Sequence, residues 1–517
     1  MAFTDKNYDL KNKKVAFRVD ASLKMGTGHV MRCLTLAQVL KENGANVEFI
    51  CRKHEGNLVG KIRSSGFVVH ELKVFEETEV GTKLAHSHWL GATQQQDASD
   101  CIDILKADKS DWLIVDHYAL DEQWQNRLKP YYEKLMVIDD LADRKHQCDI
   151  LLDQTFGRHQ EDYLLLTPEY CELLLGSQYA LLRPEFAKWR SYSLKRRSKP
   201  EFKQLLINMG GVDPNSFTGQ VLEVLKQCDL PKDLEITIIL GGGSLHLNEI
   251  KKLSREMPWL TQVKIDVTNM AEIMSNSDLS IGAAGTTTWE RCCVGLPCIQ
   301  LVIADNQITI ADALSANNAV RAIRKPLDIK KSIVDILPKL NKISLIASLM
   351  TQGGGAKVVV DAMISKYIPD EEVKLVPVTT DDSDFIYSLQ TIRTRKYFRN
   401  AIVPSQKEHQ AWYQKIINNS DAIIFLISIK GKNVGMLRID GLIFNDEIEV
   451  SVIVMETFSG QGYAKSAVQK LLAFLTNRTI KSIIHKENIA SKRLFENIGF
   501  IKIDSTHSFD TYKMINA

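Results

Sequence analysis

The sequence predicts an α/β protein in which two domains with parallel sheets precede a smaller domain of mixed α/β structure. Short apolar runs alternate with helical or polar stretches from Lys14 to about Lys366, which is typical of parallel βα units. Farther on, two apolar runs meet at Gly431, which predicts a hairpin and therefore antiparallel pairing. The length of 517 residues fits about three domains of about 100–200 residues each.

The composition is that of an ordinary globular protein, with 44% hydrophobic and 25% charged residues, which excludes collagen-like, mucin-like and wholly disordered classes. Lys and Arg number 65 against 63 Asp and Glu, so we expect neither nucleic acid nor a membrane as a partner. The nine cysteines contain no C-x-x-C pair, which argues against a zinc site or a disulfide framework. Because no signal-peptide core and no run of about 18 apolar residues occurs, we expect a cytoplasmic protein.

The first two domains are predicted over residues 12–190 and 200–366. The predicted strands of the first are VAFRVD, DWLIVDH, KLMVIDD and DILLDQ. The basic stretch KWRSYSLKRRSKPEFK, residues 188–203, predicts a solvated connection between domains. The second domain repeats the pattern with QLLINMGG, EITIILGGG, LSIGAAG and PCIQLVI, and a helix after Gly353 to Gly355 reaches about Lys366.

The third domain is predicted over residues 371–517 and follows the linker-like segment YIPDEEVKLVPVT. After the hairpin at Gly431 come the strand EIEVSVIVM, a glycine turn and a helix. The apolar stripe predicted for this helix consists of Tyr463, Ala467, Leu471, Phe474 and Leu475. A second helix begins near Asn488, with Gly499 as its predicted C-cap, and a final pair of strands follows.

A glycine turn separates the first strand from the first helix. The helix is indicated by the helical spacing of Val30, Cys33, Leu34, Ala37 and Leu40. Gly26, Thr27 and Gly28 precede it, where glycine permits close approach of a ligand and the helix amino end favours negative charge. His29 at this position can act as a general base on water. The alternative is a histidine that caps or packs at a helix start.

The second domain contains a similar turn. Gly285 ends a strand, Thr286 and Thr287 offer cap hydroxyls, and the exposed N–H groups suit a diphosphate. The buried face of the helix is predicted to consist of Trp289, Cys292, Cys293 and Leu296. Glu290, one turn into the helix, suits a ribose diol, or it only complements the helix dipole.

Taken together, five motifs resemble the nucleotide-sugar hydrolases of pseudaminic acid biosynthesis, relatives of the GT-B glycosyltransferases. They are RVDASLKMGTGHVMRCLTLA, LIVDHYALDEQW, VIDDLADRKHQCDILLDQT, NMGGVDPN and AAGTTTWERCCVGLPCIQLVIADNQ. The resemblance spans about residues 12–366 and implies a GT-B-like pair of Rossmann-type domains. It implies hydrolysis of UDP-2,4-diacetamido-2,4,6-trideoxy-β-L-altropyranose without a metal. Water attacks the anomeric carbon, and C–O cleavage expels UDP.

The resemblance also implies roles for single residues. His29 takes the catalytic position and activates or positions the water. Asp20, Arg32 and Tyr118 lie near the sugar, and Gly28 and Asp116 are further substrate-binding residues. For the carboxylates among them the alternative is a structural turn role. In the second domain Met270 meets uracil, Glu290 binds ribose, and Gly211, Thr286, Thr287 and Asn306 lie near the diphosphate. For Met270 the alternative is core packing.

In the third domain, the N–H groups of Gly460 to Ala464 can wrap a pyrophosphate, and Asn488 and Ser491 open a helix about 25 residues later. This pair of motifs resembles the GNAT acetyltransferase superfamily, whose loop binds acetyl-CoA. The coenzyme-binding residues that the resemblance implies are Val454, Gly460, Gln461, Gly462, Tyr463, Ala464, Asn488 and Ser491. Ser459 replaces the usual Gln or Arg, and Phe495 replaces a tyrosine that protonates the CoA thiolate, so Tyr512 or water substitutes, or the domain is a binding remnant.

The entrance to the third domain, with Glu408, His409 and Trp412, resembles the amino-sugar acetyltransferases of the same pathway; the alternative is an ordinary amphipathic helix. The implied acceptor is the 4-amino group of UDP-4-amino-4,6-dideoxy-N-acetyl-β-L-altrosamine, and the implied donor is acetyl-CoA. Two other functions stay open. One is a GT-B glycosyltransferase with an accessory acetyltransferase domain, and the other is a non-catalytic sensor that binds a sugar nucleotide and CoA.

Overall fold

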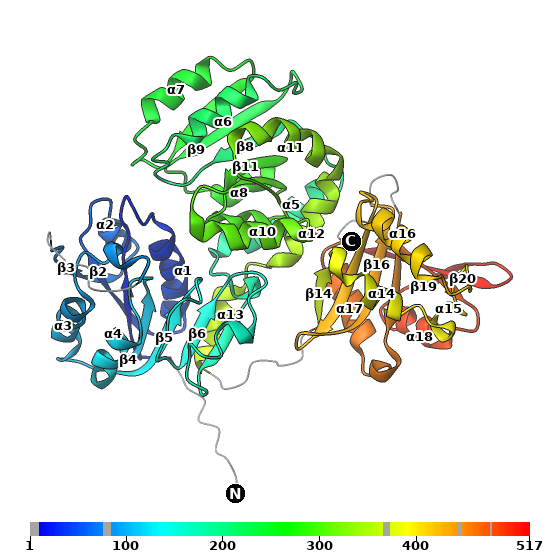
Figure 1. Ribbon diagram of the computed structural model, residues 1–517, viewed down its shortest axis with the longest axis horizontal. Helices are drawn as coiled ribbons and strands as arrows, with labels where there is room; N and C mark the ends of the chain where they lie inside the picture. Colours follow the sequence, from blue (N-terminus) through cyan, green and yellow to red (C-terminus); the bar gives the residue numbers. More distant parts are fainter. Residues whose placement is uncertain (1–9, 76–83, 365–372, 443–446, 476–477, 517) are drawn as a thin grey trace, which may run out of the picture.

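The computed structural model describes residues 10–75, 84–364, 373–442, 447–475 and 478–516. Three sheets follow one another along the chain, and Figure 1 shows each with its own helices. Glu371, the predicted start of the third domain, lies outside the described residues.

The first sheet is entirely parallel, with the order β3-β2-β1-β4-β5-β6-β7. Its strands are β1 (Lys14–Val19), β2 (Asn46–Arg52), β3 (Val68–Leu72), β4 (Ser110–Asp116), β5 (Tyr132–Ile138), β6 (Ile150–Asp153) and β7 (Glu172–Leu175). Its helices include α1 (Gly28–Glu42), α2 (Val59–Ser64), α3 (Gln94–Leu105) and α4 (Glu122–Leu128). The strand order reverses between β1 and β4, and ligands bind at the carboxyl ends of strands beside such a switch point.

The second sheet is also parallel and has the order β10-β9-β8-β11-β12-β13. Its strands are β8 (Gln204–Asn208), β9 (Glu235–Leu240), β10 (Leu260–Ile265), β11 (Leu279–Ala283), β12 (Cys298–Leu301) and β13 (Arg321–Ile323). The accompanying helices are α6 (Phe217–Leu225), α7 (Leu247–Arg255), α8 (Met270–Asn276), α9 (Thr287–Cys293), α10 (Ile308–Ala316), α11 (Ile329–Ile336) and α12 (Leu340–Met350). The switch point lies between β8 and β11, so both sheets are parallel and of the Rossmann type, as the sequence predicts.

Two helices connect the first two sheets by crossing from one part to the other. Helix α5 (Pro184–Arg196) follows the first sheet but packs against α8 and α9 of the second. Helix α13 (Gly355–Ile364) follows the second sheet but packs against α1, and its Val359 and Val360 are buried in the core of the first part. Figure 1 shows α13 beside the first sheet. The boundaries at 190, 200 and 366 therefore stay predictions.

The start of α13 has room for a glycine only. A Cβ atom on Gly355 would overlap the backbone of Tyr179 and Ala180, whereas one on the neighbouring Gly354 would meet nothing within 4 Å. We therefore expect Gly355→Ala to lower the free energy of unfolding by about 1–3 kcal/mol, the usual cost of overpacking. Gly354→Ala is the matched control and should be nearly neutral. Urea denaturation of both variants tests this, and equal midpoints would contradict it.

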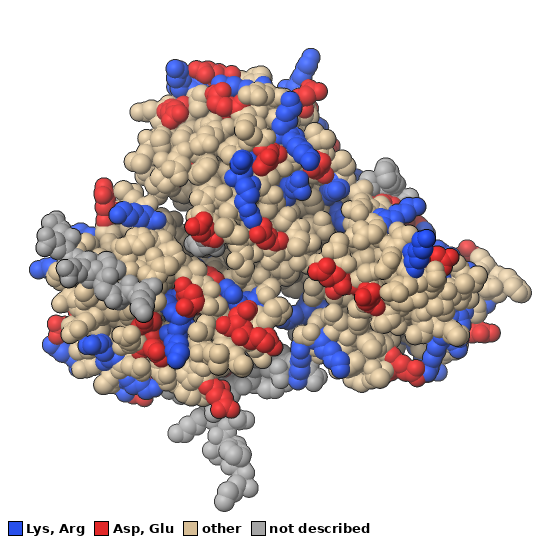
Figure 2. Space-filling view, in the orientation of Figure 1, with Lys and Arg blue, Asp and Glu red and all other residues tan. Residues whose placement is uncertain are grey.

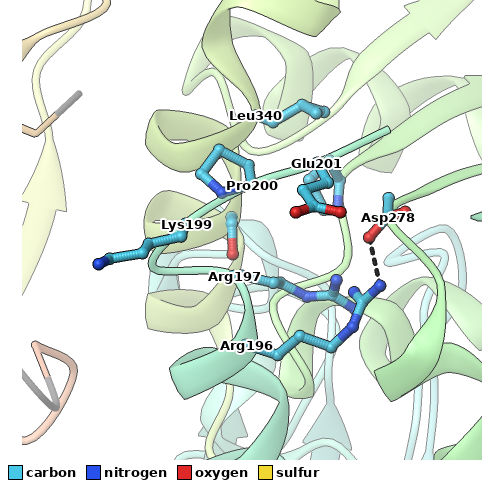
Figure 3. Close-up of a pocket in the computed structure, with 9 residues that line it drawn as sticks. Arg196, Arg197, Lys199, Pro200, Glu201, Asp278 and Leu340 are labelled. Atoms are coloured by element: carbon cyan, nitrogen blue, oxygen red, sulfur yellow. Dashed lines mark ion pairs between the residues drawn. The ribbon is translucent and has the colours of Figure 1, made fainter. Parts of the chain in front are cut away.

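The basic stretch fastens α5 to the second part. Arg196 forms an ion pair of 2.6 Å with Asp278, as Figure 3 shows. Arg197 donates hydrogen bonds of 2.5 and 2.7 Å to the carbonyls of Ser277 and Met274 at the end of α8. Burial lowers the pKa of Arg197 to about 9. The prediction of a solvated connection is therefore wrong at Arg197, because the end of α8 needs donors for its last carbonyls. Figure 2 shows acidic and basic side chains interspersed on the visible face.

The third sheet is mixed and has the order β14-β15-β16-β17-β18-β20-β19, with only β17 and β18 parallel. Its strands are β14 (Lys374–Pro377), β15 (Ala422–Ile429), β16 (Lys432–Asp440), β17 (Glu447–Val454), β18 (Arg478–His485), β19 (Ile501–Ser505) and β20 (Phe509–Asn516). Its helices are α14 (Ser383–Ser388), α15 (Ile392–Arg395), α16 (Gln406–Ile417), α17 (Tyr463–Leu472) and α18 (Ile489–Glu496). The predicted hairpin is confirmed, with Gly431 at φ 75°.

Two details of the third domain differ from the prediction. Helix α17 ends at Leu472, so Phe474 and Leu475 lie in the segment after the helix, where they are buried, instead of on a helical stripe. Helix α18 ends at Glu496, and its C-cap is Asn497 instead of Gly499. Gly499 still has a φ of 108°, which lets the chain reverse into β19.

The third domain docks on helix α12 of the second part. Lys342 donates hydrogen bonds of 3.0 and 2.7 Å to the carbonyls of Ile417 and Asn419 at the end of α16. Burial lowers the pKa of Lys342 to about 8. Arg478 donates a bond of 2.6 Å to the carbonyl of Ser198. The connection between these parts is therefore a packed interface in addition to the covalent link.

The segment Pro326–Ile364 is long and apolar enough, by length and composition, to cross a membrane. It consists of α11, α12 and α13 with turns between them, and 72% of its most apolar window is buried inside the structure. Core helices of globular proteins have the same character.

Candidate active sites

The first candidate site is centred on His29 at the start of α1 and Asp116 at the end of β4. The Nδ1 atom of His29 lies 2.6 Å from Oδ1 of Asp116 and 3.3 Å from Nη2 of Arg32. A carboxylate only accepts hydrogen bonds, so the shorter contact places the proton on Nδ1. The lone pair of Nε2 is then free to accept a proton, as a general base requires.

Arg32, one turn along α1, keeps Asp116 charged and oriented. Its Nε and Nη2 atoms donate bonds of 2.6 and 2.7 Å to the two oxygens of that carboxylate. Burial alone would raise the pKa of Asp116, but the charge of Arg32 and the hydrogen bonds from Arg32 and His29 hold it well below the usual range. Asp116 therefore stabilises a protonated His29 without taking its proton.

Tyr118 and Asp140 form the next layer of this site. The Tyr118 ring lies edge-on to His29 with ring centroids 4.7 Å apart. Its hydroxyl donates a bond of 2.8 Å to Asp140, which also accepts one of 2.5 Å from Arg32. Burial and the charge of Asp140 raise the pKa of Tyr118 well above its ordinary value, so the phenol stays protonated.

Asp20 belongs to a different group of side chains. It is fully buried, and its Oδ1 atom lies 2.7 Å from Nη1 of Arg18 and accepts a bond of 2.6 Å from the backbone N–H of Arg52. Nε2 of His117 lies 3.3 Å from Oδ2 of Asp20. Because Nδ1 of His117 accepts a bond from Ala119 N, its proton is on Nε2. The contacts of Asp20 are therefore those of a buried ion network, and the structure does not bring it together with His29.

The turns of the first two parts meet at this site. A Cβ atom on Gly28 would lie 3.2 Å from Cγ2 of Thr286, and one on Gly211 would lie 3.9 Å from Oγ1 of Thr27. The turn after β1 therefore faces the turns after β8 and β11. Thr286 is the N-cap of α9 but its side chain makes no capping bond, so the predicted cap hydroxyl is wrong there.

The other predicted nucleotide residues lie in the first turns of helices and in a short turn of the second part. Met270 begins α8 and packs, partly buried, against the core. Thr287 begins α9, and its hydroxyl accepts a bond of 3.1 Å from Arg291. Glu290 lies 3.5 Å from Nη2 of Arg183, and burial raises its pKa. Asn306 lies in the turn Asp305–Gln307, and its side chain is outside the described part of the structure.

The second candidate site lies where β17 and β18 separate. Each strand is 8 residues long, but only Glu447–Glu449 of β17 pairs with β18, where its partners are Thr479–Lys481. A cavity of about 980 Å³ opens beyond that point. Of the predicted coenzyme residues, Val454, Asn488 and Ser491 line it. The splayed strands thus provide room for an extended ligand between them.

The loop between β17 and α17 has the backbone that the sequence predicts. Gly460 and Gly462 have φ angles of 79° and 85°, and Gly462 is the N-cap of α17. Gln461 donates a bond of 3.3 Å to the carbonyl of Thr457, while Tyr463 and Ala464 form the first turn of the helix. Such a turn points successive N–H groups outward toward an anion.

Phe495 lines the cavity, packed edge-on against Phe500 with ring centroids 5.0 Å apart. Tyr512 is buried and is not one of the lining residues, and its hydroxyl donates a bond of 3.0 Å to Glu496. Burial and that carboxylate raise the pKa of Tyr512 to about 12. The suggestion that Tyr512 replaces the missing acid is therefore wrong, because its proton is held elsewhere.

The far end of the cavity is rich in arginine and includes the predicted Glu408, His409 and Trp412. Arg399 donates bonds of 2.9 and 3.0 Å to Glu449. Arg395 differs, because its Nη1 bonds only the neutral Gln390 at 3.1 Å and burial lowers its pKa. Neither Arg395 nor Asp140 is among the site residues that the sequence predicts, although the run TIRTRKYFRN and the second acid of VIDD are signals for them.

Among the residues that the structure describes, no group of three or more His, Cys, Asp or Glu side chains is arranged to hold a metal ion. Metal-independent chemistry stays a prediction.

Comparison with known protein families gives two matches. Residues 372–501 match the acetyltransferase (GNAT) domain, and residues 205–352 match the glycosyltransferase family 28 C-terminal domain. An Acinetobacter baumannii MurG structure is 17% identical, with a TM-score of 0.49 over 69% of this chain and 100% of that chain. The two parallel sheets with their switch points and the two family matches make the fold a GT-B-like pair of Rossmann-type domains followed by a mixed GNAT domain. A GNAT domain implies the use of acetyl-CoA.

Three relatives extend these matches. An uncharacterised protein of Methanocaldococcus jannaschii is 26% identical over 503 residues, 95% of this chain and 97% of the relative. The UDP-2,4-diacetamido-2,4,6-trideoxy-β-L-altropyranose hydrolase of Campylobacter jejuni is 28% identical over 274 residues, 53% of this chain and 85% of the relative. The spore coat polysaccharide biosynthesis protein SpsG of Bacillus subtilis is 22% identical over 310 residues, 59% of this chain and 82% of that one. The chain is an enzyme that joins a sugar-nucleotide part to an acetyltransferase part.

Proposed function

We propose that the chain is a cytoplasmic bifunctional enzyme of pseudaminic acid biosynthesis. Its first two domains hydrolyse UDP-2,4-diacetamido-2,4,6-trideoxy-β-L-altropyranose to UDP and free sugar. Its third domain transfers an acetyl group from acetyl-CoA to the 4-amino group of the UDP-sugar precursor. The observation that carries the proposal is the His29–Asp116 pair, whose basic nitrogen is left free beside the turns predicted to hold UDP.

The hydrolytic step follows from the charge arrangement. His29 takes a proton from a water molecule as the water oxygen bonds to the anomeric carbon of the sugar. The bond between that carbon and the phosphate oxygen breaks, and UDP leaves with the electron pair. Arg32 and Asp116 hold the imidazolium that forms. Backbone N–H groups of the turns around Gly28, Gly211 and Thr286 stabilise the charge on the departing diphosphate.

For the acetyl transfer, the amine nitrogen of the acceptor attacks the thioester carbonyl carbon, the C–S bond breaks, and the amine loses a proton. Arg395 supports an anionic acceptor, because no carboxylate within the described residues pairs with this arginine. The diphosphate of a UDP-sugar would supply that partner. We expect the third domain to acetylate the UDP-linked amino sugar and not the free amino sugar.

The two activities follow a fixed order in this proposal. An unacetylated 4-amine is cationic near neutral pH, and a pocket built for an N-acetyl group has to desolvate it without a partner. We therefore expect kcat/KM for hydrolysis to favour the diacetylated UDP-sugar over the monoacetylated one by at least about tenfold. Equal values for the two substrates would contradict the order.

Mass spectrometry of reactions with these UDP-amino sugars, with and without acetyl-CoA, tests the proposal as a whole. No acceptor sugar is added, so a hydrolase releases free sugar in an amount equal to UDP. A glycosyltransferase would leave the UDP-sugar intact under these conditions. A non-catalytic sensor would bind both ligands without forming product.

A further inference from the structure

A cluster of aromatic rings covers one side of His29. His86 and Trp89 come from the short helical turn Ser87–Trp89 and its N-cap, in the segment between β3 and α3. The Trp89 ring is stacked on Tyr118 with centroids 5.7 Å apart and an interplanar angle of 26°. The centroid of the His86 ring lies 4.4 Å from that of Trp89 and 5.4 Å from that of Tyr118. The Trp89 ring stands edge-on to His29 at 6.4 Å.

These rings differ in how far water reaches them. Tyr118 is buried beneath the cluster, whereas His86 and Trp89 are only half-buried. Within the described part of the chain, no hydrogen bond engages the indole N–H of Trp89. A tryptophan that packs on one ring and leaves the rest of its surface and its N–H available is suited to contact a ligand.

The charge of this wall is low. Burial lowers the pKa of His86 and outweighs the opposing charge of Asp143. His86 is therefore neutral near pH 7, and Trp89 and Tyr118 carry no charge. The neighbouring cation, Arg144, lies 5.7 Å from the Tyr118 ring centroid and is already ion-paired with Asp139 and Asp143. The half-buried rings therefore suit apolar C–H groups and a neutral amide better than a diphosphate.

The position of the wall is fixed relative to the reacting bond. His29 belongs to the first part of the chain and Thr286 to the second part. The two parts are close here, because a Cβ atom on Gly28 would lie 3.2 Å from Cγ2 of Thr286. A sugar whose anomeric carbon receives water from His29, and whose phosphate lies at that turn, has to pass beside the rings adjoining His29.

We propose that His86 and Trp89 form the wall of a sugar subsite, in which Trp89 packs against the apolar face of the hexose and the methyl group of an acetamido substituent. Trp89 is then a specificity-determining residue. This inference rests on the proposed hydrolase function and adds the part of the chain that recognises the sugar. The competing possibility is that the cluster only packs the segment between β3 and α3.

The test compares full-length Trp89→Ala, Trp89→Phe and His88→Ala. His88 is an exposed imidazole on the same turn and is the matched control. We expect Trp89→Ala to lower kcat/KM for the diacetylated UDP-sugar by about 10–200-fold and to reduce its preference over the monoacetylated substrate. Trp89→Phe should restore part of the loss, because a flat ring remains. His88→Ala should resemble the wild type, and the Kd for UDP should be unchanged in all three.

A second measurement does not depend on turnover. Saturation-transfer NMR with UDP-N-acetylglucosamine as the probe should show magnetisation reaching the acetamido methyl group in the wild type and a weaker signal in Trp89→Ala. A methyl signal that is present in a wild-type chain that hydrolyses nothing, and weaker in Trp89→Ala, would support the subsite and refute the hydrolase. Unchanged kcat/KM, unchanged preference and an unchanged methyl signal in Trp89→Ala would overturn the subsite and leave the hydrolase standing.

Discussion

Replacing His29 by alanine should slow the release of UDP by about 10²–10⁴-fold, the usual effect of removing a positioned general base. This change removes the Nε2 atom that is proposed to accept a proton from the reacting water. The predicted UDP contacts lie in the second part, so the Kd for UDP measured by calorimetry should stay close to that of the wild type. The rate is followed by chromatography of UDP released from the diacetylated UDP-sugar.

His88→Ala is the control for loss of an imidazole near the site, and it should retain the wild-type rate. The acetyl transfer catalysed by the third domain should also continue in His29→Ala, because that site lies in a different sheet. A His29→Ala chain that turns over like the wild type would return His29 to a packing role at the start of α1.

Gly462→Glu should abolish acetyl transfer and lower the affinity for acetyl-CoA. Gly462 has a φ of 85°, which side chains rarely adopt, and a Cβ atom there would meet no protein atom within 4 Å. The added carboxylate therefore enters the space in front of the N–H groups that begin α17, where it repels a pyrophosphate of the same charge. Calorimetry with acetyl-CoA measures the affinity, and mass spectrometry of the acetylated UDP-sugar measures the activity.

Gly431→Glu is the matched control for Gly462→Glu, because it places the same side chain at another glycine with a positive φ. Gly431 has a φ of 75°, and a Cβ atom on it also meets nothing within 4 Å, but it lies in the turn between β15 and β16. The control should bind acetyl-CoA normally even if its Tm falls. Normal affinity in a folded Gly462→Glu chain would remove the coenzyme loop from the account. UDP release from the diacetylated substrate should be unaffected by either glycine variant.

Much of the fold could be predicted because the buried strands have clear signals. VAFRVD and LSIGAAG are short apolar runs that end in polar or glycine residues, and they form the central strands β1 and β11. The edge strands β10 and β13 were not predicted. Residues of β10 are mostly exposed and mixed in polarity, and β13 contains 3 residues, so neither carries a periodic pattern.

The exchange of helices α5 and α13 could not be predicted for a different reason. Apolar residues such as Val359 and Val360 indicate that a face of α13 is buried. They do not indicate that this face packs against α1, which lies more than 300 residues earlier in the sequence. Periodicity identifies an apolar face and leaves its partner open.

The sites show the same limit. The glycine turn marks His29, but the tautomer that frees Nε2 depends on Asp116, which is 87 positions away in the sequence. Asp20 ends a strand as Asp116 does, yet its neighbours are Arg18 and Arg52, which fix it in a buried network. Two acids with similar sequence settings therefore have different surroundings, which only the packing of β1, β2 and β4 reveals.

The central claim is that water activated at His29 attacks the anomeric carbon, so the bond that breaks joins carbon to oxygen. Hydrolysis of the diacetylated UDP-sugar in H₂¹⁸O, followed by mass spectrometry of both products, tests this most directly. The account predicts that one ¹⁸O atom appears in the free sugar and none in UDP, in an amount that falls with the rate in His29→Ala. Incorporation of ¹⁸O into the terminal phosphate of UDP would show attack on phosphorus and would contradict the account.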